Sequence, residues 1–161
     1  MSDFVNTIDL LGDDVVAASI ISGTITEFND DVITSIGERA FYTRKQLKTV
    51  NLPNVTTVGG DGSFGYCTAL TCVDLASATS LTYNAFSYCS KLATLVLRSE
   101  TLCALSNSNA LNGTPFSKSG SRGTVYVPQA LIEEYQNATN WSTLYAAGTC
   151  NFVAIEGSEY E

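Results

Sequence analysis

The chain has 161 residues, of which 45% are apolar, so it is long enough for one domain with a continuous core that needs no disulfide bridges. Sixteen acidic residues against eight basic ones give a net charge of −8, which opposes binding to nucleic acid or to anionic membrane surfaces. No apolar run is long enough to cross a bilayer, and the first residues lack the basic and long apolar regions of a secretory signal. We therefore expect no membrane insertion and synthesis in the cytoplasm.

Residues 1–21 are predicted to form an N-terminal cap. Gly12 or Asp13 is placed to cap a short helix over residues 14–21, and the acidic residues of its first turn suit the positive end of the helix dipole. Such a helix would cover the open end of the repeats that follow it.

Residues 22–105 are predicted to be a run of repeats. The stretch 85–97, AFSYCSKLATLVL, has one counterpart 22 residues earlier and another 45 residues earlier, the longer interval including one extra residue in the glycine-rich loop 59–62. A weaker copy starts at Ile25 and carries Asp30 at a core position. The predicted repeat core consists of the apolar residues at matching positions: Phe41, Leu47, Val50, Leu52, Phe64, Leu70, Val73, Leu75, Phe86, Leu92, Leu95 and Leu97.

Alternating apolar residues within each repeat predict strands at residues 49–52, 72–75 and 94–97. Each coil would advance by one strand spacing, about 4.8 Å, so the strands should stack in parallel. The return side of a coil this short has no room for a full α-helix, and we expect short 3₁₀ or extended structure there, with Val55 and Val58 facing inwards. The predicted fold is a repeat solenoid, mainly β, of about four rungs with a short helical cap at each end.

The third repeat ends irregularly. Cys103 is placed at the position of Leu81, and residues 106–109 are expected to absorb the extra residues that precede Leu111.

Residues 106–155 are predicted to be a C-terminal cap. It should contain a strand over 124–127, a helix over 129–138 and a short strand over 151–155. Trp141 is expected to extend the apolar side of this cap, with a role as a ligand platform as the alternative. The last residues, 156–161, are expected to be a loose acidic tail.

The five cysteines are odd in number and show no CxxC spacing. Cys67 and Cys89 occupy the same position in successive repeats, and we interpret them as small buried hydrophobes. A disulfide or a metal site is the alternative.

The chain contains no histidine, which removes the commonest general base and the commonest metal ligand. Pairs such as Asp13-Asp14 and Glu133-Glu134 are interpreted as solvated acids, and Asn29-Asp30-Asp31 lacks the spaced ligands of a calcium loop. We predict no enzymatic activity, no cofactor and no metal. An acid-dependent glycan hydrolase is the alternative, and it would need two carboxyl groups about 5 to 9 Å apart in a cleft.

The outward side of the predicted strands is the candidate binding surface. It would present columns of small polar side chains about 4.8 Å apart. Tyr66 and Tyr88, which are equivalent in successive repeats, are candidate anchors because aromatic side chains dominate interface energetics. A tyrosine ladder that merely packs along the solenoid is the alternative. The candidate binding residues are Tyr66, Tyr88, Thr49, Asn51, Asp74 and Thr94.

The unit AF-x-x-C-x-x-L-x-x-V-x-L resembles the BspA-type leucine-rich repeats of bacteria and protozoa. Residues 85–97 are close to the consensus, whereas residues 40–52 carry Arg44 in place of the cysteine. The stretch from Val125 to Ser142 is similar to the terminal cap of repeat proteins from gut bacteria and their phages. The resemblance covers roughly residues 22–147 and implies a right-handed solenoid used for binding, with no catalytic residues.

From these observations we expect a non-enzymatic leucine-rich-repeat module that recognises a protein or cell-surface ligand, with a place in a phage virion as tail or capsid-associated component. The first alternative is a purely architectural or decoration protein, and the second is a secreted or surface adhesin fragment of a gut bacterium. Because about four rungs offer little concave surface, we also expect a homo-oligomer or a larger assembly.

Overall fold

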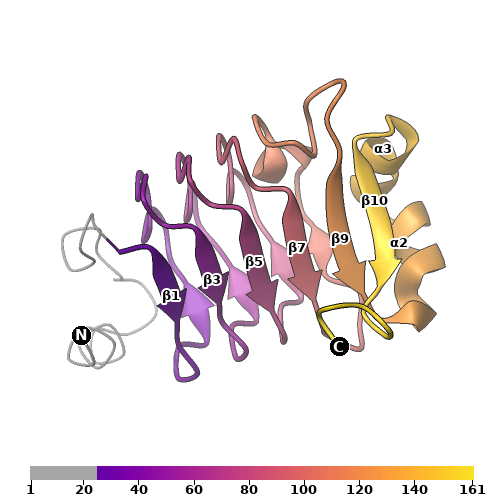
Figure 1. Ribbon diagram of the computed structural model, residues 1–161, viewed down its shortest axis with the longest axis horizontal. Coiled ribbons are helices and arrows are strands. Elements are labelled where there is room, and N and C mark those ends of the chain that lie inside the picture. Colours follow the sequence, from indigo (N-terminus) through magenta and orange to yellow (C-terminus); the bar gives the residue numbers. More distant parts are fainter. Residues whose placement is uncertain (1–24) are drawn as a thin grey trace.

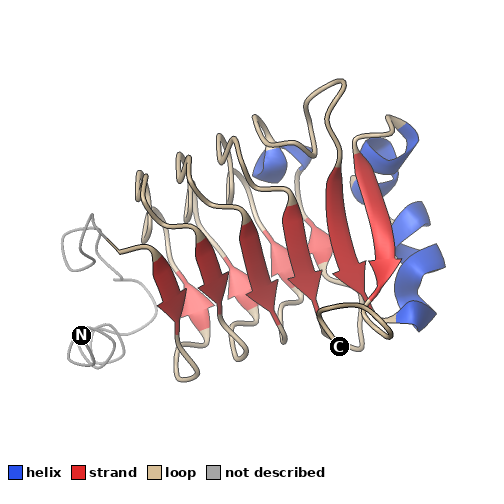
Figure 2. Cartoon of the chain, viewed as in Figure 1, coloured by secondary structure: helices blue, strands red, loops and turns tan. Residues whose placement is uncertain are grey.

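The computed structural model describes residues 25–161, and within them the chain winds as a solenoid with two layers of parallel strands (Figures 1 and 2). The predicted N-terminal cap helix over residues 14–21 lies outside the described residues. One helical cap closes the far end of the solenoid, to the right in Figure 2.

The front layer in Figure 1 is a six-stranded sheet with the order β1-β3-β5-β7-β9-β10. Its pairings are parallel, and Val50 of β3 stands beside Val73 of β5, which stands beside Leu95 of β7. The predicted alternation of buried and outward residues is confirmed for β3 and β5, whereas in β7 the outward residue Val96 is also buried. The strands are β1 (Glu27–Asn29), β3 (Thr49–Asn51), β5 (Cys72–Leu75), β7 (Thr94–Leu97), β9 (Gly123–Val127) and β10 (Cys150–Ala154).

The return legs form a second parallel sheet behind the first, with the order β2-β4-β6-β8. Each return strand has two residues, which confirms that the return side is short and extended. Front and return strands together make four complete rungs, as predicted. The return strands are β2 (Ser35–Ile36), β4 (Thr57–Val58), β6 (Ser80–Leu81) and β8 (Ala104–Leu105).

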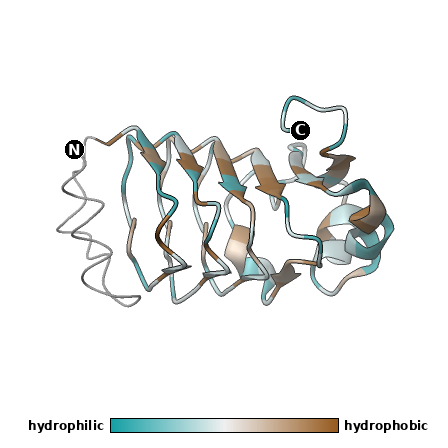
Figure 3. Cartoon of the chain, turned by 90° about the horizontal axis from the view of Figure 1, so that it is seen from below, coloured by the Kyte–Doolittle hydropathy of each residue, from teal (hydrophilic) through white to brown (hydrophobic). Residues whose placement is uncertain are grey.

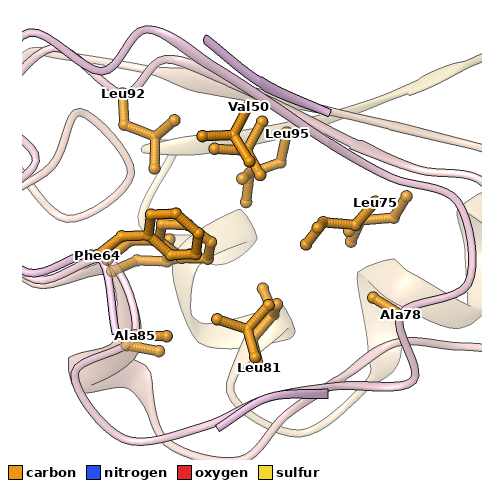
Figure 4. Packing of buried hydrophobic residues seen from close by; sticks show 14 of the residues in the cluster. Val50, Phe64, Leu75, Ala78, Leu81, Ala85, Leu92 and Leu95 are labelled. Atoms are coloured by element: carbon orange, nitrogen blue, oxygen red, sulfur yellow. The ribbon is translucent and has the colours of Figure 1, made fainter. Parts of the chain in front are cut away.

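The core lies between the two sheets, and all twelve predicted repeat-core residues are at most 2% exposed. Figure 4 shows side chains from the front strands, the return strands and the turns meeting there. Phe41, Phe64 and Phe86 stack as a column, with ring centroids 4.7 and 5.2 Å apart. Each such side chain contributes roughly 1.5–3 kcal/mol by leaving water.

Cys67 and Cys89 lie beside this phenylalanine column and are fully buried. Each thiol donates to the backbone carbonyl of the phenylalanine one rung earlier, with sulfur 3.0 Å from the oxygen of Phe41 or Phe64. Their interpretation as packing residues is confirmed, and all five cysteines of the chain are free thiols.

The irregular third rung differs from its prediction. Leu105, not Cys103, pairs with Leu81. Two of the extra residues lie between Leu97, which pairs with Leu75, and Ala104, which pairs with Ser80. Only one extra residue lies between Leu105 and Ala110. The Ala110 carbonyl accepts a hydrogen bond from the Phe86 amide, just as the Ala85 carbonyl accepts one from the Phe64 amide, and this equivalence fixes the count. The insertion was misplaced because a buried cysteine at 103 fits the apolar pattern as well as Leu105 does.

The C-terminal cap contains a 3₁₀ turn (Gln129–Leu131), α2 (Ile132–Asn137) and α3 (Trp141–Ala146). The continuous helix predicted over 129–138 was therefore wrong at both ends. Ala138 leaves the helical region, with φ −72° and ψ 148°, and Asn140 turns the chain with φ 65°. Trp141 is fully buried, as a core role requires.

Side chains of the cap form hydrogen bonds with the backbone at the edge of the return sheet, where another strand would otherwise pair. The Cys103 amide donates to the Tyr135 hydroxyl at 2.8 Å, and the Trp141 indole donates to the Cys103 carbonyl at 2.8 Å. The Asn140 amide donates to the Leu105 carbonyl at 2.7 Å. Buried backbone groups that would otherwise lack partners are thus bonded.

Within residues 25–161 no helix has both the length and the apolar character that a membrane span requires.

Candidate binding surface

We define the strand face as the outward side of the front sheet from β1 to β9. Its side chains stand in two columns, because residues that point outwards alternate with core residues. The first column contains Glu27, Thr49, Cys72, Thr94 and Thr124, and the second contains Asn29, Asn51, Asp74, Val96 and Tyr126.

The structure brings the four candidate residues from the strands together on this face. Thr49 and Thr94 lie on either side of Cys72 in one column, and Asn51 is the neighbour of Asp74 in the other. Asn51 is exposed and the other three are half-buried. These polar groups can accept and donate hydrogen bonds to a partner laid across the strands, and their binding role stays a prediction.

Arg98 is a member of the site that the sequence reasoning missed. Its guanidinium forms a bidentate ion pair with Asp74. Nε donates to Oδ1 at 3.0 Å, and one terminal nitrogen donates to Oδ2 at 2.8 Å. This hydrogen bonding raises the pKa of Arg98 above its ordinary value. The available signal was the spacing: Val96 is the partner of Asp74 in the next rung, and Arg98 lies two residues further on the same face.

The C-terminal segment, residues 156–161, folds over the part of the strand face nearest the cap, so the expectation of a loose tail was wrong. Tyr160 packs on Tyr126, with ring centroids 4.5 Å apart, and its carbonyl accepts a hydrogen bond from Arg98. In Figure 3 this segment lies on the outer side of the front sheet. The segment holds its own shape through Ser158, whose backbone and side chain both donate to the Ile155 carbonyl.

Val96 shows how much of the face this segment covers. It points away from the core and stands between Asp74 and Tyr126, yet it is fully buried. Asn51, two rungs away in the same column, remains exposed. The strand face therefore has an open part on β1 and β3 and a covered part on β5, β7 and β9.

Cys72 lies at the border of the covered part. Its thiol donates weakly to the Tyr160 hydroxyl, with the two atoms 4.0 Å apart. Burial raises the pKa of Cys72, and desolvation together with the neighbouring thiol raises the pKa of Tyr160 to about 12. Both groups are therefore neutral at pH 7, and their contact carries no charge.

Tyr66 and Tyr88 do not lie on the strand face but in the turns that precede β5 and β7. These turns run along the upper edge of the solenoid in Figure 1. Their repeat equivalence is confirmed, since their amides donate to the matching carbonyls of Ser87 and Asn112. The two rings stack on each other, with centroids 4.7 Å apart and an angle of 17° between their planes. They are 39% and 46% exposed.

This stacking limits what the two tyrosines can offer a ligand. The inner face of each ring is used by the other, and Tyr88 also lies against Gly113, the residue at the same turn position one rung later. A flat sugar or base would need a free ring face. The stacked ring faces are closed to a ligand, which favours the ladder interpretation without testing a binding role.

A hollow of about 780 Å³ lies between β8 and α2. Leu105 and Trp141 contribute to its apolar lining, and Glu133 and Glu134 contribute carboxylates. Among residues 25–161 no cluster of three or more histidine, cysteine or acidic side chains is suited to hold a metal ion. Asp30 uses one carboxylate oxygen to accept the amides of Val32 and Ile33 and so forms a local turn.

In a comparison with protein families, residues 20–138 match the BspA type leucine-rich repeat region in six copies. No curated protein matches the chain. No solved structure matches it either.

Proposed function

We propose that this chain, which belongs to the BspA-type leucine-rich repeat family, is a non-enzymatic protein that recognises a partner protein or cell-surface ligand through its strand face. The observation that carries the proposal is that this face already holds a peptide segment of the chain itself. Tyr160 is seated on it by a ring contact, a hydrogen bond from Arg98 and a thiol contact. A surface that binds one peptide in this way has the chemistry to bind another.

The open part of the face supports the same proposal. Thr49 and Asn51 present small polar groups at the two outward positions of β3, and Glu27 and Asn29 continue the two columns on β1. Regularly spaced small side chains allow close approach over a broad area, which is how repeat proteins bind extended partners.

A paired set of variants tests the use of this face. Asn51→Arg places a large cation on the open part, whereas Thr57→Arg places the same side chain on the outward side of the return sheet. Partners would be captured from cells of the source organism by chemical cross-linking and identified by mass spectrometry. We expect Asn51→Arg to lose a partner that Thr57→Arg keeps. A partner set unaffected by both substitutions would contradict the proposal.

The architectural alternative makes a different prediction for the tyrosine ladder and the face. If only the ends of the solenoid dock on other subunits, Asn51→Arg and the double substitution of Tyr66 and Tyr88 by alanine should leave assembly unchanged. If the ladder anchors a partner, the double substitution abolishes binding while the circular dichroism spectrum stays that of the folded chain.

For the location we propose a larger assembly, such as a phage particle, on the strength of the resemblance alone. The neighbouring genes test this proposal. Tail or capsid genes beside this one would support it, and a neighbouring export or surface-anchoring system would favour the adhesin alternative.

A further inference from the structure

The C-terminal segment binds the strand face through groups that many peptides share. Tyr160 contributes its ring to Tyr126, its hydroxyl to Cys72 and its backbone carbonyl to Arg98. Two carboxylates of the segment form hydrogen bonds with backbone amides away from the face. Glu156 accepts one from the Gln129 amide, and Glu161 accepts one from the Gly157 amide within the segment itself. The contacts of the segment with the face therefore come from a tyrosine side chain and its backbone carbonyl, and not from the carboxylates of Glu156 and Glu161.

The strands supply the receiving side of this contact. Asp74 on β5 holds the Arg98 guanidinium in a fixed orientation through contacts of 2.8 to 3.1 Å. Between them and Tyr126 lies Val96, an apolar residue on a face that is otherwise polar. The Arg98 guanidinium can donate to a backbone carbonyl, and Val96 and Tyr126 beside it can pack against a ring. The site is therefore suited to an aromatic residue that presents both groups.

We propose that this covered part of the strand face is a binding site for a tyrosine-bearing peptide segment of a partner protein, and that residues 156–161 occupy it until the partner displaces them. The inference rests on the proposed recognition function and names the chemistry that the face selects. A partner segment seated there would continue onto the open part at Thr49 and Asn51, which lie in the same two columns. The resident segment acts as an intramolecular competitor.

Direct binding of a peptide tests the proposal. The probe is a fluorescein-labelled hexapeptide with the sequence of residues 156–161, and the protein is the full chain carrying Tyr160→Ala, which removes the resident ring. We expect the peptide to bind this variant at least about ten-fold more tightly than the unmodified chain, because a tethered competitor acts at an effective concentration of roughly millimolar. Fluorescence anisotropy measures the affinity.

The Cys72 thiol gives a second readout at the site itself. Cys72 is half-buried, whereas Cys67, Cys89, Cys103 and Cys150 are at most 2% exposed. Tyr160→Ala should speed the reaction of one thiol with a disulfide reagent, and added peptide should slow it again. The four buried thiols should stay unreactive, which verifies that the variant is folded. Tyr83→Ala, at an exposed tyrosine in a turn, is the matched control and should change neither rate nor affinity.

Three results would overturn the inference. One is a folded Tyr160→Ala chain that does not bind the peptide, and another is binding that survives Arg98→Gln or the replacement of tyrosine by alanine in the peptide. The third is a concentration-dependent dimer that Tyr160→Ala abolishes, because it would show that the segment is exchanged between copies. If the peptide fails while Asn51→Arg still removes a captured partner, this inference falls and the proposed function stands.

Discussion

At the scale of the residue, one turn position has an unusual backbone conformation before each of β3, β5, β7 and β9. Thr43, Tyr66 and Tyr88 have φ near +60°, and Gly113 follows them with φ +72°. A left-handed backbone is costly for residues other than glycine, by about 1 kcal/mol or more. The stacked tyrosine rings offset part of this cost, since such aromatic pairs contribute roughly 0.5–1.5 kcal/mol.

Gly113→Ala should therefore destabilise the chain more than Gly120→Ala. Both glycines have positive φ, but a Cβ atom at Gly113 would lie 2.8 Å from the Tyr88 ring, whereas one at Gly120 would have no atom within 4 Å. We expect an extra loss of about 1–2 kcal/mol in the free energy of unfolding at Gly113, measured in urea. In a Tyr88→Ala background most of this extra loss should disappear, because only the 3.2 Å approach to the Tyr88 Cα remains, and an undiminished difference there would contradict this explanation.

The thiols should differ in reactivity according to their burial. Desolvation raises the pKa of Cys103 and of Cys150 to about 12 and raises that of Cys89 as well. At pH 8 a disulfide reagent should therefore modify one thiol in the folded chain, Cys72, and all five after unfolding in urea. Peptide mapping of the labelled chain identifies the site. Labelling of Cys103 before Cys72 would show that the cap opens more readily than its packing indicates.

At the scale of the element, the C-terminal cap replaces a strand by side chains. Tyr135 on α2 accepts the Cys103 amide, and Trp141 on α3 donates to the Cys103 carbonyl. The left-handed turn at Asn140 separates the two helices and brings its amide to Leu105. The helix breaks because one straight helix could not bring the Tyr135 hydroxyl, the Asn140 side-chain amide and the Trp141 indole to the sheet edge together.

Tyr135→Phe removes the hydroxyl that accepts the buried Cys103 amide and keeps the ring. We expect the free energy of unfolding to fall by about 1–3 kcal/mol, the cost of leaving a buried donor without a partner. Tyr145→Phe is the control, because Tyr145 is 40% exposed and its hydroxyl makes no hydrogen bond within the described chain. Equal melting temperatures for the two variants would contradict this role of the cap.

At the scale of the whole molecule, the last residues return to rungs far earlier in the sequence. Arg98 and Tyr160 are 62 positions apart, and Cys72 and Tyr160 are 88 apart. The segment joins β5, β7 and β9 across the strand face and leaves the part on β1 and β3 open. The extent of the open strand face is thus set by both ends of the described chain.

The contact of this segment should weaken at high pH. The pKa of Tyr160 is raised from its ordinary value of 10.0 to about 12 in the folded chain, so the docked state favours the neutral phenol. Its contribution to stability is fully present below pH 10 and is lost as the pH rises through about 12. Absorbance titration of the unmodified chain minus that of Tyr160→Phe should show one phenol with a midpoint near the higher value. A midpoint at the ordinary value would contradict the docked arrangement.

The sequence by itself determined the repeat register, the front strands, the inward return residues and the buried Cys67 and Cys89. These features depend on local alternation and on a regular period, and both are visible in a single chain because each rung contacts only its neighbours. The same register placed Thr49, Asn51, Asp74 and Thr94 on one face.

Only the tertiary structure decided the irregular parts. The strand position of Leu105, the broken cap helix and the seat of Tyr160 depend on contacts between residues that no period relates. Val96 illustrates the difference: its alternation correctly predicts that it points outwards, yet it is fully buried because a distant segment returns to cover it. A repeat period predicts contacts between equivalent residues of neighbouring rungs. It does not predict where the C-terminal cap and segment pack, because their residues have no equivalents in the other rungs.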